Sequence, residues 1–327
     1  MSAIVAENLV KHFGLEIRAV DGIDLDIPEG QVFGFLGQNG SGKTTTVRML
    51  ATLIKPTSGS ASVAGVDVLA NPAGVRRCIG VALQEVGLDE LQTGRELISL
   101  QSRLFGIGGA ETKKRVAELL EVVTLTDAAD RPLKTYSGGM KRRLDLACAL
   151  VHRPSVIFLD EPTTGLDPVT RDAVWRYVQD LNVNDGVTFF LTTQYMDEAD
   201  RLTHDIAIMD AGKIVARGSP AELKAQIGAD AITLTFAGGQ QALGEAEPIL
   251  RRFEGAEDVR VVENELVLYI RNGASMVANV VRALDDANLP IAQLRLTHPT
   301  LDDVFLRATG HYLDLDGKPA QFAGAKR

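Results

Sequence analysis

The most informative stretch of the sequence is Gly37-Gln38-Asn39-Gly40-Ser41-Gly42-Lys43-Thr44, which matches the phosphate-loop pattern Gly-x-x-x-x-Gly-Lys-(Ser/Thr). That pattern is meaningful only between a strand and a helix. The apolar run Val32–Leu36 predicts a buried strand, and Thr45–Leu50 predicts a helix. Such a loop points successive backbone N–H groups inward, and the helix adds the positive end of its dipole. The stretch therefore predicts a phosphate cradle in which Lys43 reaches the outer phosphates and the Thr44 hydroxyl binds Mg²⁺. The alternative is an accidental glycine-rich turn, and the flanking strand and helix argue against it.

Length and composition describe an ordinary globular chain. Its 327 residues exceed the size of one compact core and predict two domains. The sequence contains no run of about 18 apolar residues and no signal pattern at its start, so we expect a cytoplasmic location. The net charge of −9, without a basic block, argues against a nucleic-acid partner, because phosphate neutralisation needs clustered Lys and Arg.

Two adjacent carboxylates, Asp160 and Glu161, end an apolar run that begins at Ser155. Neighbouring side chains at a strand end point in different directions, so one acid can face a metal ion while the other faces a water molecule. Asp160 would hold Mg²⁺, and Glu161 would accept a proton from the attacking water. The alternative is a strand capped by a solvated acidic turn, but the upstream phosphate loop favours the chemical roles.

A second candidate anion site lies at Ser137-Gly138-Gly139, directly before an amphipathic segment at 141–150. Ser137 is expected to be the N-cap, and two glycines leave the backbone N–H groups of the first turn uncovered. Most Ser-Gly-Gly triplets form plain turns, so the triplet alone leaves both interpretations open.

Strand-like runs alternate with helical segments through the middle of the chain. A helix is predicted at 169–181, followed by a buried strand at 186–194 whose end carries Gln194. This alternation predicts an α/β fold with a largely parallel sheet, in which ligands gather at the carboxyl ends of the strands. Gly37, Asp160 and Gln194 all lie at such ends, so we expect them to form one crevice.

The residues around this α/β core fall into two further patterns. Alternating apolar and polar residues predict half-buried antiparallel strands at 3–11, 22–27 and 60–64. Phe13, between the first two, could stack on an adenine ring or pack in the core. The segment from about 85 to 152 is mainly helical.

Within this helical segment, apolar residues at helical spacing are expected to be mostly core positions. Any of them left exposed would form a partner-binding patch. They are Leu97, Leu100, Leu104 and Phe105, and then Val116, Leu119, Leu120 and Val123.

Taken in order, these motifs resemble the nucleotide-binding domain of ATP-binding-cassette (ABC) transporters. The resemblance covers about residues 3–218. It rests on the phosphate loop, Gln84, Tyr-Ser-Gly-Gly-Met at 136–140, the strand ending in Asp160-Glu161-Pro162, Gly165-Leu166-Asp167, and Gln194. It implies a P-loop ABC ATPase fold with an antiparallel β subdomain and a helical subdomain at about 85–152. It also implies ATP and Mg²⁺ as cofactors.

The resemblance implies a role for each motif. Phe13 would stack on adenine, and the rest of the ATP would be bound by Gly37, Gln38, Asn39, Gly40, Ser41, Gly42, Lys43, Thr44 and Thr45. The implied metal ligands are Thr44, Gln84 and Asp160, and the implied catalytic residues are Glu161, Lys43 and Gln194. Ser137, Gly138 and Gly139 would bind the γ-phosphate of ATP held by a second copy of the chain, with Asp167 at the dimer contact. Two copies would then enclose two ATP molecules head to tail.

The sequence departs from the family pattern at two places. Tyr136 and Met140 stand where the signature motif usually has Leu and Gln, but its Ser-Gly-Gly centre is intact. Gln194 stands at the position usually held by a switch His. A glutamine can donate a hydrogen bond to the γ-phosphate but cannot carry a positive charge. We therefore expect slower or differently arranged hydrolysis, with ATP binding and dimerisation preserved.

A second domain is predicted at 219–312, followed by a frayed tail at 313–327. A capping box at Ser219-Pro220-Ala221-Glu222 starts a helix, and the segments beyond it follow the order β-α-β-β-α-β, which predicts a small ferredoxin-like α+β module. A last helix at about 300–306 presents Leu301, Val304 and Phe305 on one face. That face either packs back onto the module or binds a partner. A similar segment, together with Gln at the switch position, is found in ATPases of daunorubicin-resistance-type drug exporters.

These features predict a cytoplasmic ATPase that pairs with a second copy of itself and docks on a separate membrane permease at the inner face of the membrane. The expected cargo is a hydrophobic drug or antibiotic. A lipid or polysaccharide exporter is an alternative, and so is a regulatory nucleotide-binding module with little turnover, because of Gln194. An ATPase acting on ribosomes or DNA is disfavoured, since the sequence has one phosphate loop and no sustained heptads.

Overall fold

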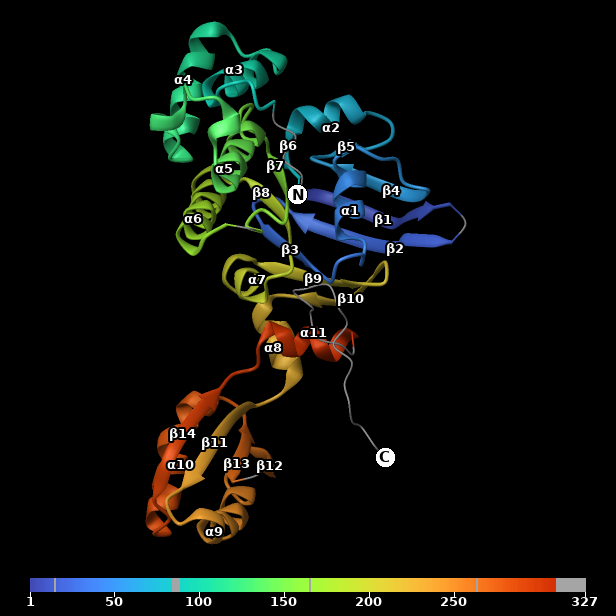
Figure 1. Ribbon diagram of the computed structural model, residues 1–327. Helices are drawn as coiled ribbons and strands as arrows, with labels where there is room; N and C mark the ends of the chain where they lie inside the picture. The colour runs from blue at the N-terminus through green and yellow to red at the C-terminus, as the bar shows by residue number, and fades with distance from the viewer. Residues whose placement is uncertain (15, 84–88, 165, 263, 310–327) are drawn as a thin grey trace. The chain divides into compact units, whose positions relative to one another are not determined.

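The structure is a computed structural model that describes residues 1–14, 16–83, 89–164, 166–262 and 264–309 (Figure 1). The chain divides into two compact units, Met1–Pro220 and Ala221–His311. Among the described residues, none of the helices is both long enough and apolar enough to cross a membrane. The tail predicted at 313–327 lies outside the described residues.

The first unit contains an antiparallel sheet with the strand order β2-β1-β4-β5. Its strands are β1 (Ser2–Phe13), β2 (Ile17–Pro28), β4 (Ser58–Val63) and β5 (Val66–Asp67). In β2, the buried residues Ile23 and Leu25 alternate with the exposed Asp24 and Asp26, so one face of the sheet packs on the core. The prediction of half-buried antiparallel strands is confirmed.

The second sheet of this unit is largely parallel, with the order β10-β9-β3-β8-β7-β6. Its strands are β3 (Val32–Leu36), β6 (Ile79–Ala82), β7 (Val156–Asp160), β8 (Thr188–Thr193), β9 (Asp205–Asp210) and the antiparallel β10 (Lys213–Gly218). Leu36 pairs with Thr193, and Asp160 pairs with Thr192, so the chain leaves β3, β8 and β7 at one edge. The predicted α/β fold is confirmed, and the three predicted strand ends are neighbours.

The two faces of the parallel sheet belong to different hydrophobic clusters, because successive side chains of a strand point to opposite faces. Phe33, Phe158 and Phe190 lie in the cluster that also holds the antiparallel sheet and α1 (Lys43–Leu50). The ring centroids of Phe33 and Phe158 are 5.4 and 5.6 Å from that of Phe190. Leu159 and Leu191 lie in the cluster formed with the helices of the other face.

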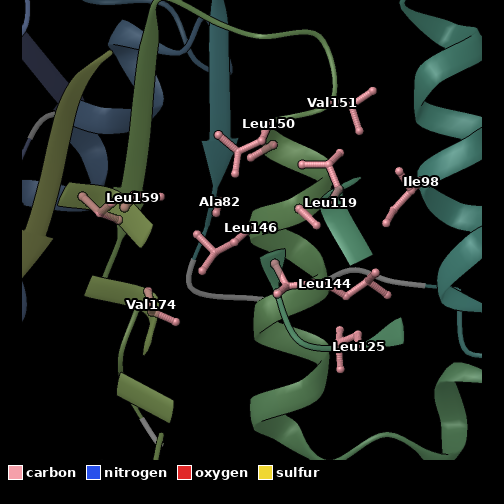
Figure 2. Packing of buried hydrophobic residues seen from close by; sticks show 14 of the residues in the cluster. Ala82, Ile98, Leu119, Leu125, Leu144, Leu146, Leu150, Val151, Leu159 and Val174 are labelled. Carbon is pink, nitrogen blue, oxygen red and sulfur yellow. The ribbon is translucent and has the colours of Figure 1, made fainter. Parts of the chain in front are cut away.

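The helices of that face form the predicted helical subdomain and its junction with the sheet (Figures 1 and 2). They are α3 (Gly94–Leu104), α4 (Gly109–Val122), α5 (Gly138–Ala149) and α6 (Pro168–Asp185), with short 3₁₀ turns at Thr126–Ala128 and Leu133–Thr135. Helix α5 contacts α3, α4 and β6. Figure 2 shows Leu144 and Leu146 of α5 packing in the cluster that contains Ile98 and Leu159. Two shorter helices, α2 (Pro72–Cys78) and α7 (Met196–Leu202), complete the unit.

One expected core stripe is largely exposed. Leu97 is 6% exposed, but Leu100, Leu104 and Phe105 are 39%, 71% and 39% exposed. Helix α3 packs through Leu97 and its neighbours Ile98 and Ser102, so the side that carries Leu100 and Leu104 faces solvent. The core prediction is therefore wrong for these three residues, whereas it is confirmed for Val116, Leu119, Leu120 and Val123.

The second unit is a ferredoxin-like α+β module flanked by two helices. Its antiparallel sheet has the order β12-β13-β11-β14. The strands are β11 (Asp230–Phe236), β12 (Ala256–Val262), β13 (Glu265–Ile270) and β14 (Ile291–Thr297). Helices α9 (Gly239–Arg251) and α10 (Gly273–Asp286) contribute Leu250 and Leu284 to a core shared with Leu234 and Leu268 of the sheet. The predicted order β-α-β-β-α-β is confirmed.

The terminal helix of this unit, α11 (Leu301–Thr309), has a buried apolar face. Leu301, Val304 and Phe305 are 2%, 4% and 0% exposed. Arg307 Nη1 donates hydrogen bonds to the carbonyl oxygens of the last two residues of α8 (Pro220–Ile227). The face is covered within the chain, so the alternative of an open partner-binding strip is wrong.

The aromatic cluster of the parallel sheet predicts a specific stability loss. Replacing Phe190, which is 0% exposed, by Ala should lower the free energy of unfolding by about 3–5 kcal/mol, because a large cavity forms among neighbouring rings. Urea unfolding followed by the fluorescence of Trp175 checks this, since that single tryptophan reports on the first unit. Val183→Ala, at a position that is 79% exposed, is the control and should change stability by less than about 0.5 kcal/mol.

Candidate functional site

The phosphate loop lies between β3 and α1, where the sequence pattern placed it. Gly42 is the N-cap of α1 and has a φ angle of 112°, in the region that favours glycine. A Cβ atom there would lie 2.2 Å from the carbonyl oxygen of Ala19 and 2.6 Å from the terminal methyl of Met209. Only glycine fits at this position, because the loop passes so close to its neighbours.

A cavity of about 470 Å³ opens over this loop. Of the predicted site residues, its lining includes Phe13, Asn39, Gly40, Gly42, Lys43, Thr44, Thr45 and Glu161. Ser41 lies within the loop, and its buried Oγ atom has no hydrogen-bond partner among the described residues. The structure therefore brings the predicted phosphate cradle, the aromatic residue and the candidate base to one cavity.

Lys43 supplies a cation to the lining of the cavity. Its Nζ atom donates to the carbonyl oxygens of Gly37 at 2.7 Å and Gln38 at 2.9 Å, and the residue is only 4% exposed. Burial lowers the pKa of Lys43 because it disfavours the charged form, while the nearby charges of Glu161 and Asp160 act in the opposite direction. A phosphate group would offer this ammonium a further anionic partner.

Phe13 is 45% exposed at the mouth of the cavity, so the alternative of a packed core residue is wrong. The Nζ atom of Lys11 lies 5.2 Å from the centre of its ring. An exposed ring beside a phosphate cradle offers a stacking surface for a planar base.

Asp160 and Thr44 form a site that fits Mg²⁺. Asp160 is 1% exposed, and its Oδ1 atom accepts hydrogen bonds from Thr192 Oγ1 at 2.6 Å and from Thr44 Oγ1 at 3.2 Å. Its buried Oδ2 atom has no hydrogen-bond partner among the described residues. A buried carboxylate oxygen without a partner is costly, and oxygen ligands of this kind are those that Mg²⁺ prefers.

Glu161 follows Asp160 in a strained backbone conformation. Its φ angle is 49°, and its N–H group donates to the carbonyl oxygen and the hydroxyl of Thr192 at 3.1 and 3.0 Å. Such a conformation costs about 1–3 kcal/mol and is typical of functional sites. Glu161 is 7% exposed and lines the cavity, so the alternative of a solvated acidic turn is wrong.

The second candidate anion site lies apart from this cavity. Ser137 caps α5 by accepting a hydrogen bond from the Met140 N–H group at 3.2 Å, and both Ser137 and Gly138 are exposed. Gly139, on the first turn of α5, is partly buried. The lining of the phosphate-loop cavity does not include this triplet. One chain therefore carries two phosphate-binding candidates that it does not bring together.

Comparison with known proteins agrees with this geometry. Residues 20–164 match the family described as ABC transporter, and residues 218–309 match the C-terminal domain of DrrA1-3-like ATP-binding proteins. The chain is 43% identical to the daunorubicin resistance ATP-binding protein DrrA2 of Streptomyces coeruleorubidus, covering 94% of this chain and 95% of that protein. The chain belongs to the DrrA group of ABC transporter ATP-binding proteins.

Two further comparisons agree with this assignment. The chain is 44% identical to the daunorubicin/doxorubicin resistance protein DrrA of Streptomyces peucetius, over 95% of this chain and 94% of that protein. Its fold matches the dimeric ATP-binding cassette MJ0796 bound to ADP and Pi, with a TM-score of 0.62 and 28% identity over 66% of this chain and 98% of that one. This ABC ATPase therefore binds nucleotide and hydrolyses ATP as a transporter subunit.

The structure shows the environment of the residues at which this ABC ATPase departs from the family pattern. Tyr136 is 6% exposed, and its hydroxyl donates to the carbonyl oxygen of Ala128 at 2.7 Å, so a tyrosine fits where the pattern has Leu. Met140 is partly buried against the cluster of the helical subdomain. Gln194 is half-buried and directly follows β8. The predicted metal ligand Gln84 lies outside the described residues.

Sequence reasoning missed Arg142, which is 5% exposed on α5. Its guanidinium donates to the carbonyl oxygens of Asp160 at 2.8 Å and Pro162 at 3.0 Å, and to that of Leu83. It thus connects the helix of the signature motif to the end of β7. The sequence did contain a signal that Arg142 is buried: it lies four residues before Leu146, on the apolar side of α5.

The close approach at Gly42 predicts loss of nucleotide binding on substitution. Gly42→Ala should weaken ATP binding by more than about tenfold, because relieving the overlap with Ala19 displaces the loop. Titration with a fluorescent ATP analogue measures this. Gly65→Ala is the control, since Gly65 has a φ angle of 73° but a Cβ atom added there would meet open space, and it should retain the parental affinity. An unchanged affinity of Gly42→Ala would contradict this account of the loop.

Proposed function

We propose that this ABC ATPase uses Mg²⁺-dependent ATP hydrolysis to drive efflux of a hydrophobic drug or antibiotic through a separate membrane permease, to which it binds at the cytoplasmic face. The observation that carries the proposal is the cavity that Lys43, Thr44 and Glu161 line together with the exposed Phe13. Relatives that match nearly the whole chain are named for daunorubicin and doxorubicin resistance. These names favour a drug over the lipid or polysaccharide alternative.

The catalytic roles follow from the positions of the residues. Glu161 would accept the proton of a water molecule whose oxygen attacks the γ-phosphorus, while the bond to the β-phosphate oxygen breaks and ADP and phosphate leave. Lys43 would stabilise the negative charge on the phosphates, and Gln194 would donate a hydrogen bond to the γ-phosphate. Bound at Thr44 and Asp160, Mg²⁺ would neutralise phosphate charge.

We propose that the working form is a dimer that encloses ATP between two copies. The support is the separation of the exposed Ser137-Gly138-Gly139 turn from the phosphate-loop cavity in one chain. A second copy could place its helix tip on the γ-phosphate, where the backbone N–H groups and helix dipole favour an anion. Cassettes with this fold have been solved as dimers.

We also propose a division of roles between the two domains: residues 1–218 would bind ATP, and residues 219–312 would form an accessory domain.

We propose that the permease contacts the exposed apolar residues at the end of α3. Phe105 and Leu53 line a hollow of about 320 Å³ between the helical subdomain and the sheet, and Leu100 and Leu104 are exposed on α3. Apolar groups gathered on a surface favour a protein contact. A membrane partner fits the assignment of the chain to the ABC transporter ATP-binding proteins.

Replacing the candidate base distinguishes a transporter ATPase from a regulatory nucleotide-binding module with little turnover. Glu161→Gln should lower steady-state phosphate release by more than about 100-fold, because the proton acceptor is lost, while ATP binding is retained. With Mg²⁺ and ATP this variant should accumulate as a dimer in size-exclusion chromatography. Lys43→Ala is the comparison that should lose nucleotide binding itself. Equal phosphate release by Glu161→Gln and the parent would favour the regulatory module.

The proposed permease contact predicts a selective loss of association. Leu104→Glu should reduce the amount of membrane protein that copurifies with the tagged chain by more than about fivefold, because a charge replaces an apolar contact. ATP binding by the purified variant should stay at the parental level. Val183→Glu, at another exposed apolar position, is the matched control. Equal copurification of Leu104→Glu and the control would argue against this contact.

A further inference from the structure

A buried carboxylate outside the predicted motifs lies beside the catalytic strand ends. Glu198 belongs to α7, and its side chain is 3% exposed. Thr163 Oγ1 donates to its carboxylate, lying 2.8 Å from each oxygen. Thr163 follows Glu161 by two residues, so this contact connects α7 to the loop that carries the candidate base.

The same carboxylate reaches the segment that carries Gln194. Thr193 Oγ1 donates to Glu198 Oε2 at 3.3 Å, and it accepts a hydrogen bond from the Tyr195 N–H group at 2.9 Å. Gln194 is the residue between Thr193 and Tyr195. Because one hydroxyl bridges the carboxylate and the following turn, Glu198 restricts the backbone on both sides of Gln194.

A third segment joins through Arg171, on the first turns of α6. Its Nε atom lies 3.3 Å from Glu198 Oε1, close enough for an ion pair but without hydrogen-bond geometry. The guanidinium carbon of Arg171 also lies 4.8 Å from the centre of the Tyr195 ring. Through its backbone N–H group, Arg171 makes the ordinary helical hydrogen bond to the carbonyl oxygen of Asp167, at 2.9 Å. Because Arg171 lies four residues after Asp167, the N-cap of α6, the cluster reaches the start of α6, where the family resemblance implies a dimer contact.

The cluster of Glu198, Thr163, Thr193 and Arg171 is poorly explained as a device for stabilising the core. Burial raises the pKa of Glu198, although the hydrogen bond from Thr163 and the charge of Arg171 act in the opposite direction. Apolar side chains of similar volume often stabilise a core as well as or better than buried ionic groups. A buried carboxylate that accepts hydrogen bonds from two threonine hydroxyls and lies beside one guanidinium is therefore better explained by a need for precise backbone placement.

We propose that Glu198 is a positioning residue for ATP hydrolysis, which holds Gln194 in fixed relation to the Glu161 loop and to the start of α6. This inference rests on the proposed function. Glu198 is absent from the lining of the phosphate-loop cavity and acts through Thr193 and Thr163. The described hydrogen-bond and ion-pair partners of Glu198 include no residue of the phosphate loop. Loss of the carboxylate should therefore slow the chemical step and leave nucleotide affinity unchanged.

The test compares Glu198→Gln with Asp197→Asn, an equivalent charge-neutralising change at the exposed neighbouring position. Steady-state phosphate release, the Kd of a fluorescent ATP analogue and the melting temperature are measured on the full chain. Glu198→Gln should lower kcat by about tenfold with Kd within about twofold of the parent. Asp197→Asn should match the parent. A parental kcat in Glu198→Gln would overturn the inference.

A double-mutant cycle with Gln194→Ala separates positioning from general stabilisation. If Glu198 acts by placing Gln194, then Glu198→Gln should lower kcat by less than about twofold in the Gln194→Ala background. Full additivity of the two losses would overturn the inference. Should Glu198→Gln fail to fold, Thr193→Val decides, because it removes the bridging hydroxyl with little change of shape: a similar loss of kcat supports the positioning role, and a parental kcat refutes it.

Different results would contradict the proposed function and the positioning role of Glu198. A parent chain that releases no phosphate above the level of Glu161→Gln would overturn the proposed function. An active parent with an unaffected Glu198→Gln variant would overturn only the positioning role of Glu198.

Discussion

The site depends on the parallel register of β3, β8 and β7. Because Leu36 pairs with Thr193, and Thr192 pairs with Asp160, the chain leaves three neighbouring strands at one edge of the sheet. This edge fixes the distance between the phosphate loop and the two acids. The 2.6 Å hydrogen bond from Thr192 to Asp160 is a direct consequence of the register. A slip of one residue would turn every side chain of the strand to the opposite face and separate these groups.

At this edge, buried charges are stabilised mainly by backbone carbonyl oxygens and hydroxyl groups. Lys43 donates to two carbonyl oxygens of its own loop, and Arg142 donates to carbonyl oxygens at the end of β7. Glu198 is bound by two threonine hydroxyls. The contacts to carbonyl oxygens hold the backbone itself, whereas an ion pair between two side chains would fix only their tips. The candidate base, on a strained backbone, is thus held on several sides.

Local patterns in the sequence predicted the local structure. The phosphate loop, the strand before it and the β-α-β-β-α-β order follow from glycine spacing and hydrophobic periodicity, which act over a few residues. Exposure of Leu104 and burial of Glu198 depend on which helix face meets which neighbour, and periodicity alone does not decide this. The role of Arg142 is equally non-local, because its acceptors Asp160 and Pro162 lie 18 and 20 residues away. Gln194 stands out only against a family pattern.

In the role proposed for Gln194, a neutral side chain would make geometry more important than charge. Among the described residues predicted for the site, Lys43 is the cation and Asp160 and Glu161 are the acids, so a switch His would add a second cation. An amide contributes only a hydrogen bond, whose strength falls steeply when its angle departs from linearity. A residue that acts through direction alone needs a rigid backbone, and the Thr193 hydroxyl that caps the Tyr195 N–H group supplies that rigidity. The positioning role proposed for Glu198 would meet the same requirement, because a weaker donor at the strand end must be placed more exactly.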